Sequence, residues 1–165
     1  MRGRDDMIDV TVITVGTLKE SYLSEGVSEY KKRLSQFARV DEINIKEERI
    51  RNEDDQSEIR RALDAEGVKI LAAIPKGAAK IAMCVEGREY DSPALAALIG
   101  ALGDERGRIA LIIGSSHGLS ENVKRECGVR LSLSRLTFPH QLMRVILYEA
   151  LYRSFTILAG KRYHK

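Results

Sequence analysis

Three short stretches of the chain carry residue types that could do chemistry. Residues 114–118 (Gly-Ser-Ser-His-Gly) combine two hydroxyls and an imidazole with two glycines. Residues 137–140 (Thr-Phe-Pro-His) place a second imidazole after a proline, and residues 163–164 (Tyr-His) add a third near the end. A hydroxyl can act as a nucleophile, an imidazole transfers protons near neutral pH, and small residues let the backbone approach a ligand.

The first stretch matches the G-x-S-x-G pattern of a serine hydrolase, with Ser116 as the nucleophile. That fold needs an acid and then a histidine after the serine. No Asp follows Ser116, and His140 precedes Glu149 rather than following it. A serine hydrolase is therefore the disfavoured alternative, and it stays open at this point.

The same stretch follows an apolar run, residues 108–113, which is typical of a strand buried on both faces of a parallel sheet. It lacks the signatures G-x-x-x-x-G-K-[ST] and G-x-G-x-x-G, so neither phosphate-binding loop is indicated. A second short strand, residues 130–134, leads into a polar turn and a helix that Pro139 opens. Ligands bind beyond the carboxyl ends of parallel strands, so these two turns are predicted to wall one pocket.

Strands and helices alternate along the rest of the sequence. This alternation predicts an α/β fold with a mostly parallel sheet and helices on both faces. The strand at 80–85 is expected to end at Glu86-Gly87, and the helix that begins at Ser92 is expected to end at Gly103. The remaining predicted strands are residues 8–15 and 40–45, and the remaining predicted helices are residues 21–36, 59–74, 120–126 and 139–158.

Length and composition indicate a single domain. Residues 7–165 are predicted to form it, and residues 1–6, which are polar and aperiodic, are predicted to be a disordered extension. No apolar run is long enough for a membrane span and no signal-peptide core is present, so no membrane association and a cytoplasmic location are expected. Cys84 and Cys127 match no metal-ligand spacing and are expected to be free thiols.

Charge is distributed unevenly along the chain. The net charge is +3, yet residues 128–165 carry seven basic side chains against Glu149 alone, a balance of +6. The first 127 residues must then sum to −3. This separation favours an anionic partner on the C-terminal side, while a solvated basic face is the plain alternative.

Three stretches together resemble one known family. They are residues 114–119, residues 133–140 (Leu-Ser-Arg-Leu-Thr-Phe-Pro-His) and the ending Gly-Lys-Arg-Tyr-His-Lys at 160–165. The chain resembles, from Met7 onward, the RlmH family of bacterial SPOUT-class methyltransferases, which methylate N3 of a pseudouridine in large-subunit (23S) ribosomal RNA. The resemblance implies a C-terminal trefoil knot, S-adenosylmethionine as methyl donor, no metal, a homodimer, and rRNA within the assembled ribosome as the substrate.

The resemblance also implies where the methyl donor binds, namely at three loops that follow strands. In two places the chain departs from the family pattern, because Ser115 replaces an expected glycine and Cys84 an expected acid. The loss of that acid removes a carboxylate that could contact the cofactor. The implied cofactor-binding residues are Met83, Cys84, Gly114, Leu133, Ser134, Arg135, Leu136, Thr137 and Phe138.

The helix after Pro139 and the basic tail complete the implied site. His140, Arg144, Tyr148 and Tyr152 recur every fourth residue, and apolar residues cover the opposite side of this helix. The resemblance assigns catalysis to His164, Arg144 and Tyr163, whereas composition alone favours a frayed, solvated tail. A non-catalytic ribosome-associated protein is the other alternative. The implied RNA-binding residues are Arg135, His140, Arg153, Lys161 and Arg162.

Overall fold

The computed structural model describes residues 6–165, and its centre is a five-stranded sheet in which every strand pairing is parallel. The strands lie in the order β2-β1-β4-β3-β5. All their carboxyl ends therefore meet at one edge, as the sequence predicted. Their bounds are Ile8–Val15 (β1), Ala38–Ile45 (β2), Ala79–Glu89 (β3), Arg108–Ile113 (β4) and Val129–Ser132 (β5).

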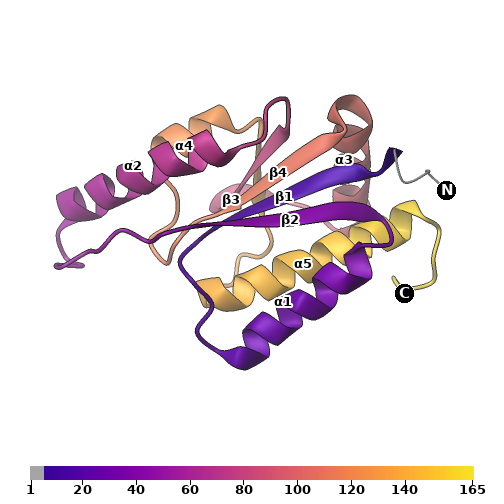
Figure 1. Cartoon of the computed structure of the whole chain (residues 1–165), viewed down its shortest axis with the longest axis horizontal. Helices are drawn as coiled ribbons and strands as arrows, with labels where there is room; N and C mark the ends of the chain where they lie inside the picture. The colour runs from indigo at the N-terminus through magenta and orange to yellow at the C-terminus, as the bar shows by residue number, and fades with distance from the viewer. Residues whose placement is uncertain (1–5) are drawn as a thin grey trace.

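Helices cover both faces of this sheet (Figure 1). Alternate side chains of β4 show why, since Ile109 and Leu111 pack into the core beneath α1, α3 and α5, while Ile112 packs beneath α2 and α4. The α/β class and the two-sided layering are confirmed. The trefoil knot stays a prediction. The helix bounds are Ser21–Leu34 (α1), Gln56–Ala73 (α2), Ser92–Arg106 (α3), Glu121–Glu126 (α4) and His140–Leu158 (α5).

Two glycines do not end elements where the sequence predicted. Helix α3 continues through Gly103 to Arg106, and the left-handed cap is Gly107, with φ 69°. A Cβ on Gly103 would lie 2.2 Å from Cδ1 of Ile8, so the absence of a side chain here lets α3 pack closely on Ile8 of the sheet. Strand β3 likewise continues past Glu86 and Gly87 to Glu89.

Of the predicted disordered extension, residues 1–6, all but Asp6 lie outside the described residues. The described domain extends to Lys165, and within it no helix combines the length and the hydropathy that crossing a bilayer requires.

Candidate functional site

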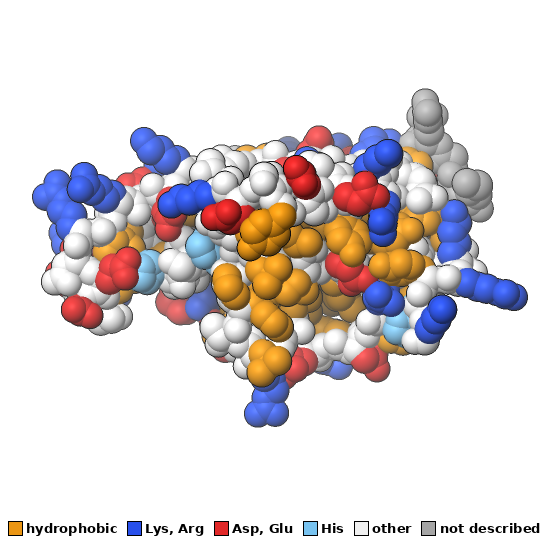
Figure 2. All heavy atoms as spheres, turned by 90° about the horizontal axis from the view of Figure 1, so that it is seen from below, with side chains coloured by type: hydrophobic (Ala, Val, Ile, Leu, Met, Phe, Trp, Pro, Cys, Tyr) orange, Lys and Arg blue, Asp and Glu red, His pale blue; other side chains and the backbone are white. Residues whose placement is uncertain are grey.

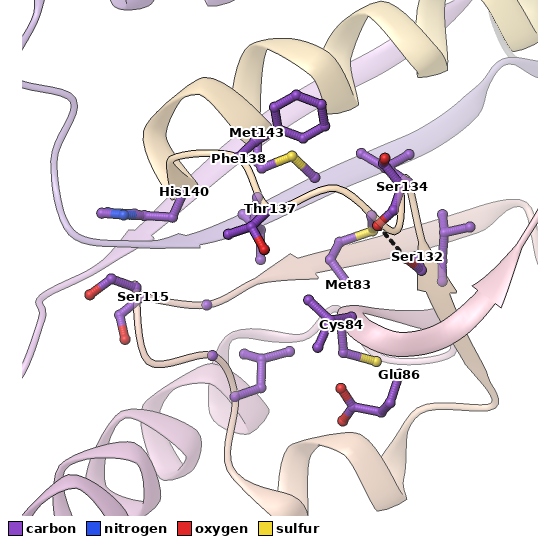
Figure 3. Close-up of a pocket in the computed structure, with 18 of the residues that line it drawn as sticks. Met83, Cys84, Glu86, Ser115, Ser132, Ser134, Thr137, Phe138, His140 and Met143 are labelled. Carbon is purple, nitrogen blue, oxygen red and sulfur yellow. Dashed lines mark hydrogen bonds between the residues drawn. The ribbon is translucent and has the colours of Figure 1, made fainter.

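A cavity of about 310 Å³ opens at the carboxyl ends of β3, β4 and β5. Small-molecule sites begin at about this size. The three loops that follow these strands form its walls, and the start of α5 closes one side with His140 and Met143 (Figure 3). Buried apolar side chains, including Met83, Ile113 and Leu131, line it from the sheet side.

The β3 wall is a bulge that the sequence did not predict. Strand β3 pairs with β5 up to Met83, which lies opposite Leu131, and pairing then resumes with Arg88 opposite the same Leu131. The intervening residues 84–87 leave the ladder, and residues 84–86 line the cavity. Gly87 makes this return possible, because a Cβ there would lie 2.6 Å from the carbonyl carbon of Leu131.

The β4 wall is the glycine turn. Gly118 adopts φ 89°, and its backbone N–H donates to the carbonyl oxygen of Ser115 at 2.9 Å. A Cβ on Gly114 would lie 2.2 Å from the carbonyl oxygen of Gly118. Gly114 therefore makes room for the backbone of Gly118 rather than for a ligand. This contact keeps the turn tight beside the cavity.

Hydroxyl groups fix the β5 wall. The Ser132 hydroxyl donates to the carbonyl oxygen of Ser134 at 3.0 Å, which is the dashed contact in Figure 3. The Ser134 hydroxyl in turn accepts the backbone N–H of Leu136 at 3.0 Å. These contacts hold the loop so that Thr137 and Phe138 reach the cavity, while the side chain of Leu136 remains 71% exposed.

A single ion pair lies in the cavity wall among the described residues. A Glu86 carboxylate oxygen lies 2.5 Å from Lys124 Nζ, and both residues line the cavity. The hydrogen bond from Lys124 lowers the pKa of Glu86, which keeps the carboxylate charged. Burial raises the pKa of the neighbouring Cys84 thiol, so this sulfur stays protonated and unreactive.

The comparisons with known proteins address the same span of chain. A family model described as a predicted SPOUT methyltransferase matches residues 8–164. The chain belongs to the SPOUT methyltransferase family. The ribosomal RNA large subunit methyltransferase H of Shouchella clausii is 42% identical over 159 residues, which span 96% of this chain and all of that protein. The protein of the same name from Bacillus pumilus is 40% identical over the same shares.

Solved structures support the fold alone. A probable methyltransferase from Bordetella pertussis superposes with a TM-score of 0.53 at 12% identity, and the match covers 91% of this chain and 97% of that one. This similarity extends over nearly the whole length of both chains and supports a shared fold.

All but one of the predicted cofactor-binding residues line this one cavity of the SPOUT domain. The exception is Arg135, whose side chain is 90% exposed and whose Nε lies 3.8 Å from a carboxylate oxygen of Glu89. Glu86 and Lys124 were missed. The bulge that places Glu86 has no sequence signal, whereas Lys124 could have been found as a basic residue on the helix after the glycine turn. The residues that the structure brings together are Met83, Cys84, Gly114, Leu133, Ser134, Leu136, Thr137 and Phe138.

Arg144 does not line the cavity. It is 2% exposed, and its Nη2 donates to the carbonyl oxygens of Val15 and Gly16, both at 2.6 Å. Tyr148, one turn further along α5, is fully buried and donates to Glu42. Two residues of the polar stripe predicted on this helix, Arg144 and Tyr148, are therefore buried, and Arg144 links α5 to the end of β1. Its predicted role in catalysis stays a prediction.

The C-terminal tail lies at the other end of α5. The Tyr163 hydroxyl donates to Glu149 at 3.2 Å, and its ring centroid lies 4.8 Å from that of Tyr152. His164 Nδ1 lies 3.4 Å from a guanidinium nitrogen of Arg153. With a helical rise of about 1.5 Å per residue, Arg153 lies roughly 20 Å along α5 from His140. Within one chain, the structure therefore does not bring Tyr163 and His164 to the cavity.

The remaining predicted RNA-binding residues lie apart from one another. His140 lines the cavity, Lys161 donates to Gln36 at 3.2 Å near the tail, and Arg162 is exposed. Burial and then the charge of Arg144 lower the pKa of His140, which favours a neutral imidazole at neutral pH. Arg153 forms an ion pair with Glu149 at 2.6 Å, so its positive charge is partly neutralised within the chain.

The geometry of Ser116 does not support the hydrolase alternative. Ser116 is exposed, and no hydrogen bond joins its hydroxyl to a histidine among residues 6–165. The strained nucleophile turn is also missing, because only glycines have positive φ in the described chain. Within the same residues, no group of three His, Cys, Asp or Glu side chains is placed to hold a metal ion.

Proposed function

We propose that this chain transfers the methyl group of S-adenosylmethionine to N3 of a pseudouridine in large-subunit ribosomal RNA. The relatives that are about 40% identical over nearly the whole chain are named for methylation of this RNA. The observation that carries the proposal is that, in a chain of the SPOUT methyltransferase family, three strand-end loops converge on one cavity of suitable size.

The residues of the cavity fit the methyl donor chemically. An apolar floor with backbone groups around it suits an adenine and a thioether-like chain. The family pattern has its acid at the position of Cys84, and Glu86 supplies a carboxylate two residues further on. This charged carboxylate can attract a sulfonium or accept a hydrogen bond from a ribose hydroxyl. When bound, S-adenosylmethionine supplies an electrophilic methyl group, so no covalent enzyme intermediate is needed.

The protein's own contribution is alignment and proton management. Holding the nucleophile in line with the methyl group can contribute about 7–11 kcal/mol. An imide nitrogen must lose its proton before it attacks, so a base or a cation that stabilises the anion is needed. We assign this work to His164 and Arg144, and Tyr163 helps to position the nucleobase. The buried guanidinium of Arg144 donates to the Gly16 carbonyl.

The active form in this proposal is a homodimer in which the tail of one protomer reaches the cavity of the other. The position of the tail, roughly 20 Å along α5 from His140, supports a contribution in trans. Figure 2 shows hydrophobic side chains gathered on the face that includes α5. On this helix Leu142, Met143 and Ile146 are only half-buried. Exposed apolar patches of this kind mark interfaces.

The RNA contacts follow from charge. Arg135, Arg153, Lys161 and Arg162 are assigned to phosphates of ribosomal RNA in the assembled ribosome, and the protein acts in the cytoplasm. Basic side chains contribute binding through counterion release, which is independent of base sequence. Nothing in this set reads bases, so the position of the pseudouridine must be selected by the shape of the ribosome.

One experiment tests the activity directly. Large-subunit rRNA from cells with and without the gene is digested to nucleosides and analysed by mass spectrometry. A methylated pseudouridine should be present only with the gene, and isolated large subunits from the deletion strain should regain it on incubation with protein and donor. An identical nucleoside profile in both strains would overturn the proposal.

A further inference from the structure

A second cavity, of about 570 Å³, lies beside the first at the carboxyl ends of β1 and β2. His140 lines both cavities, so one side chain forms a shared wall between them. None of the site residues derived from the sequence except His140 lines it. The lining residues are Gly16, Thr17, Lys19, Asn44, Lys46, Glu47, His140 and Gln141.

The electrostatics of this second cavity favour an anion. The lining holds Lys19 and Lys46 against a single acid, Glu47, and neither lysine forms an ion pair with any of residues 6–165. Outside the lining, Lys46 is near enough to Glu48 to lower the pKa of that carboxyl. Arg144 lies behind the cavity, where its Nη2 donates to the carbonyl of Gly16 and its buried Nε has no partner among the described residues. Its charge adds positive potential there, which the nearby carboxylates of Glu42 and Glu47 partly offset.

The two amide side chains of the lining have unused hydrogen-bonding groups. The amide nitrogen of Asn44 donates to the Thr14 hydroxyl and to the Gly16 carbonyl, which leaves its oxygen free to accept. The oxygen of Gln141 accepts the backbone N–H of Lys19 at 3.4 Å, which leaves its nitrogen free to donate. One free acceptor and one free donor match the alternating N–H and C=O groups of a pyrimidine base edge.

We propose that the second cavity binds the target nucleotide of the RNA substrate. Lys19 and Lys46 hold its phosphate. Asn44 accepts from N1–H of its base and Gln141 donates to the neighbouring C2 carbonyl, so that N3 points past His140 toward the first cavity. This inference rests on the proposed function, since it names the place where that substrate lies. Unstacking of the target nucleotide from the RNA is expected for an enzyme that modifies a base.

The test compares the wild-type protein with a double variant, Lys19→Ala with Lys46→Ala, and with the matched control Lys76→Ala. Lys76 is an exposed lysine in the loop before β3, at the opposite edge of the sheet. Large subunits from a strain lacking the gene serve as substrate. Three quantities are measured: KM and kcat of methyl transfer, the Kd of S-adenosylmethionine by calorimetry, and the salt dependence of subunit binding by sedimentation.

We expect the double variant to raise KM about tenfold and to reduce the slope of log K against log salt by about 1–2, because up to two phosphate contacts are lost. The Kd of S-adenosylmethionine and kcat should remain near wild type, and Lys76→Ala should match wild type throughout. The inference is overturned if KM and the salt slope of the double variant stay at wild-type values.

Failure of the proposed function would look different. In that case the wild-type protein itself would transfer no methyl group to the subunits. The sedimentation measurement would still report on the cavity, because it needs no turnover. A wild-type salt slope in the double variant would then overturn the inference independently.

Discussion

At the scale of single residues, Arg144 gives the clearest case of a charged group with a structural contact. Its guanidinium is buried, yet it bonds to two main-chain carbonyls at the end of β1 rather than to a carboxylate. Burial lowers the pKa of Arg144 from its ordinary value, which shows that the site disfavours the charge even though arginine remains protonated. The two hydrogen bonds of Arg144 must therefore offset this cost by stabilising the fold or the site.

Arg144→Ala is expected to lower the free energy of unfolding by about 2–4 kcal/mol, because the buried contact with the Val15 carbonyl is lost and a large side chain leaves a void. Arg144→Lys should recover only part of this loss, since one ammonium cannot reproduce the fork of a guanidinium. Urea denaturation followed by circular dichroism measures both. Wild-type stability in Arg144→Ala, together with lost turnover, would instead show that its role is catalytic alone.

His140 predicts a pH dependence of stability. Burial and Arg144 lower its pKa from 6.5, so the unfolded chain takes up this proton at a higher pH than the folded chain does. Where the unfolded state binds more protons, stability falls as the pH falls. The wild type should therefore lose stability between about pH 7.5 and about pH 5.5 more steeply than His140→Gln. Equal losses in urea titrations of the two proteins would contradict this.

At the scale of elements, the sequence contained enough to place the sheet and the cavity. The apolar run that became β4 is nearly continuous because both faces of this strand are buried, and β1 was indicated by the alternation of Val and Ile with polar residues. Loops that follow such strands must share one edge, so two of them could be predicted to wall one pocket. The third loop and the expected cofactor-binding residues came from the family resemblance. Of these residues Arg135 alone does not line the cavity, because a loop residue can point outward as easily as inward.

Glycines show where sequence reasoning reaches its limit. Gly103 and Gly107 look alike in the sequence, yet the first is needed for contact with Ile8 and only the second for its positive φ. Gly87 likewise suggested a strand end, although it allows β3 to rejoin β5 after the bulge. Close packing depends on partners distant in the chain, which no local pattern records. The inward direction of Arg144 was hidden for the same reason.

Gly87→Ala is expected to destabilise the protein by about 1–3 kcal/mol, since the added methyl would overlap the backbone of Arg130 and Leu131. It should also weaken S-adenosylmethionine binding, because residues 84–86 of the same bulge line the first cavity. Calorimetry with the donor and thermal unfolding measure the two effects.

The matched control is Gly128→Ala. A Cβ on Gly128 meets no atom within 4 Å, and its φ is not positive. This substitution should leave both stability and affinity near wild type, or raise stability slightly through the unfolded state. If the two alanine variants behaved alike, the bulge would not depend on the missing side chain at position 87.

At the scale of the whole molecule, helix α5 separates the parts of the proposed active site. Its first residue lines the cavity, while its last turns hold the tail through the cluster of Glu149, Tyr152, Arg153 and Tyr163. Because α5 is a rigid rod roughly 28 Å long, a protomer cannot fold its own tail onto its own cavity without breaking this cluster. In the proposed homodimer, the tail of one protomer therefore meets the cavity of the other.

A complementation experiment decides between this arrangement and a tail that acts within its own chain. Thr137→Trp fills the first cavity, because Thr137 lies in its wall, and His164→Ala removes the proposed base. Each homodimer should be inactive. In a heterodimer purified by two different tags, the His164→Ala protomer keeps its cavity and the Thr137→Trp protomer supplies an intact tail to it. One complete site then forms, and the heterodimer should recover about half of the wild-type turnover per dimer, whereas a tail acting in cis would leave every site with one defect and no recovery at all.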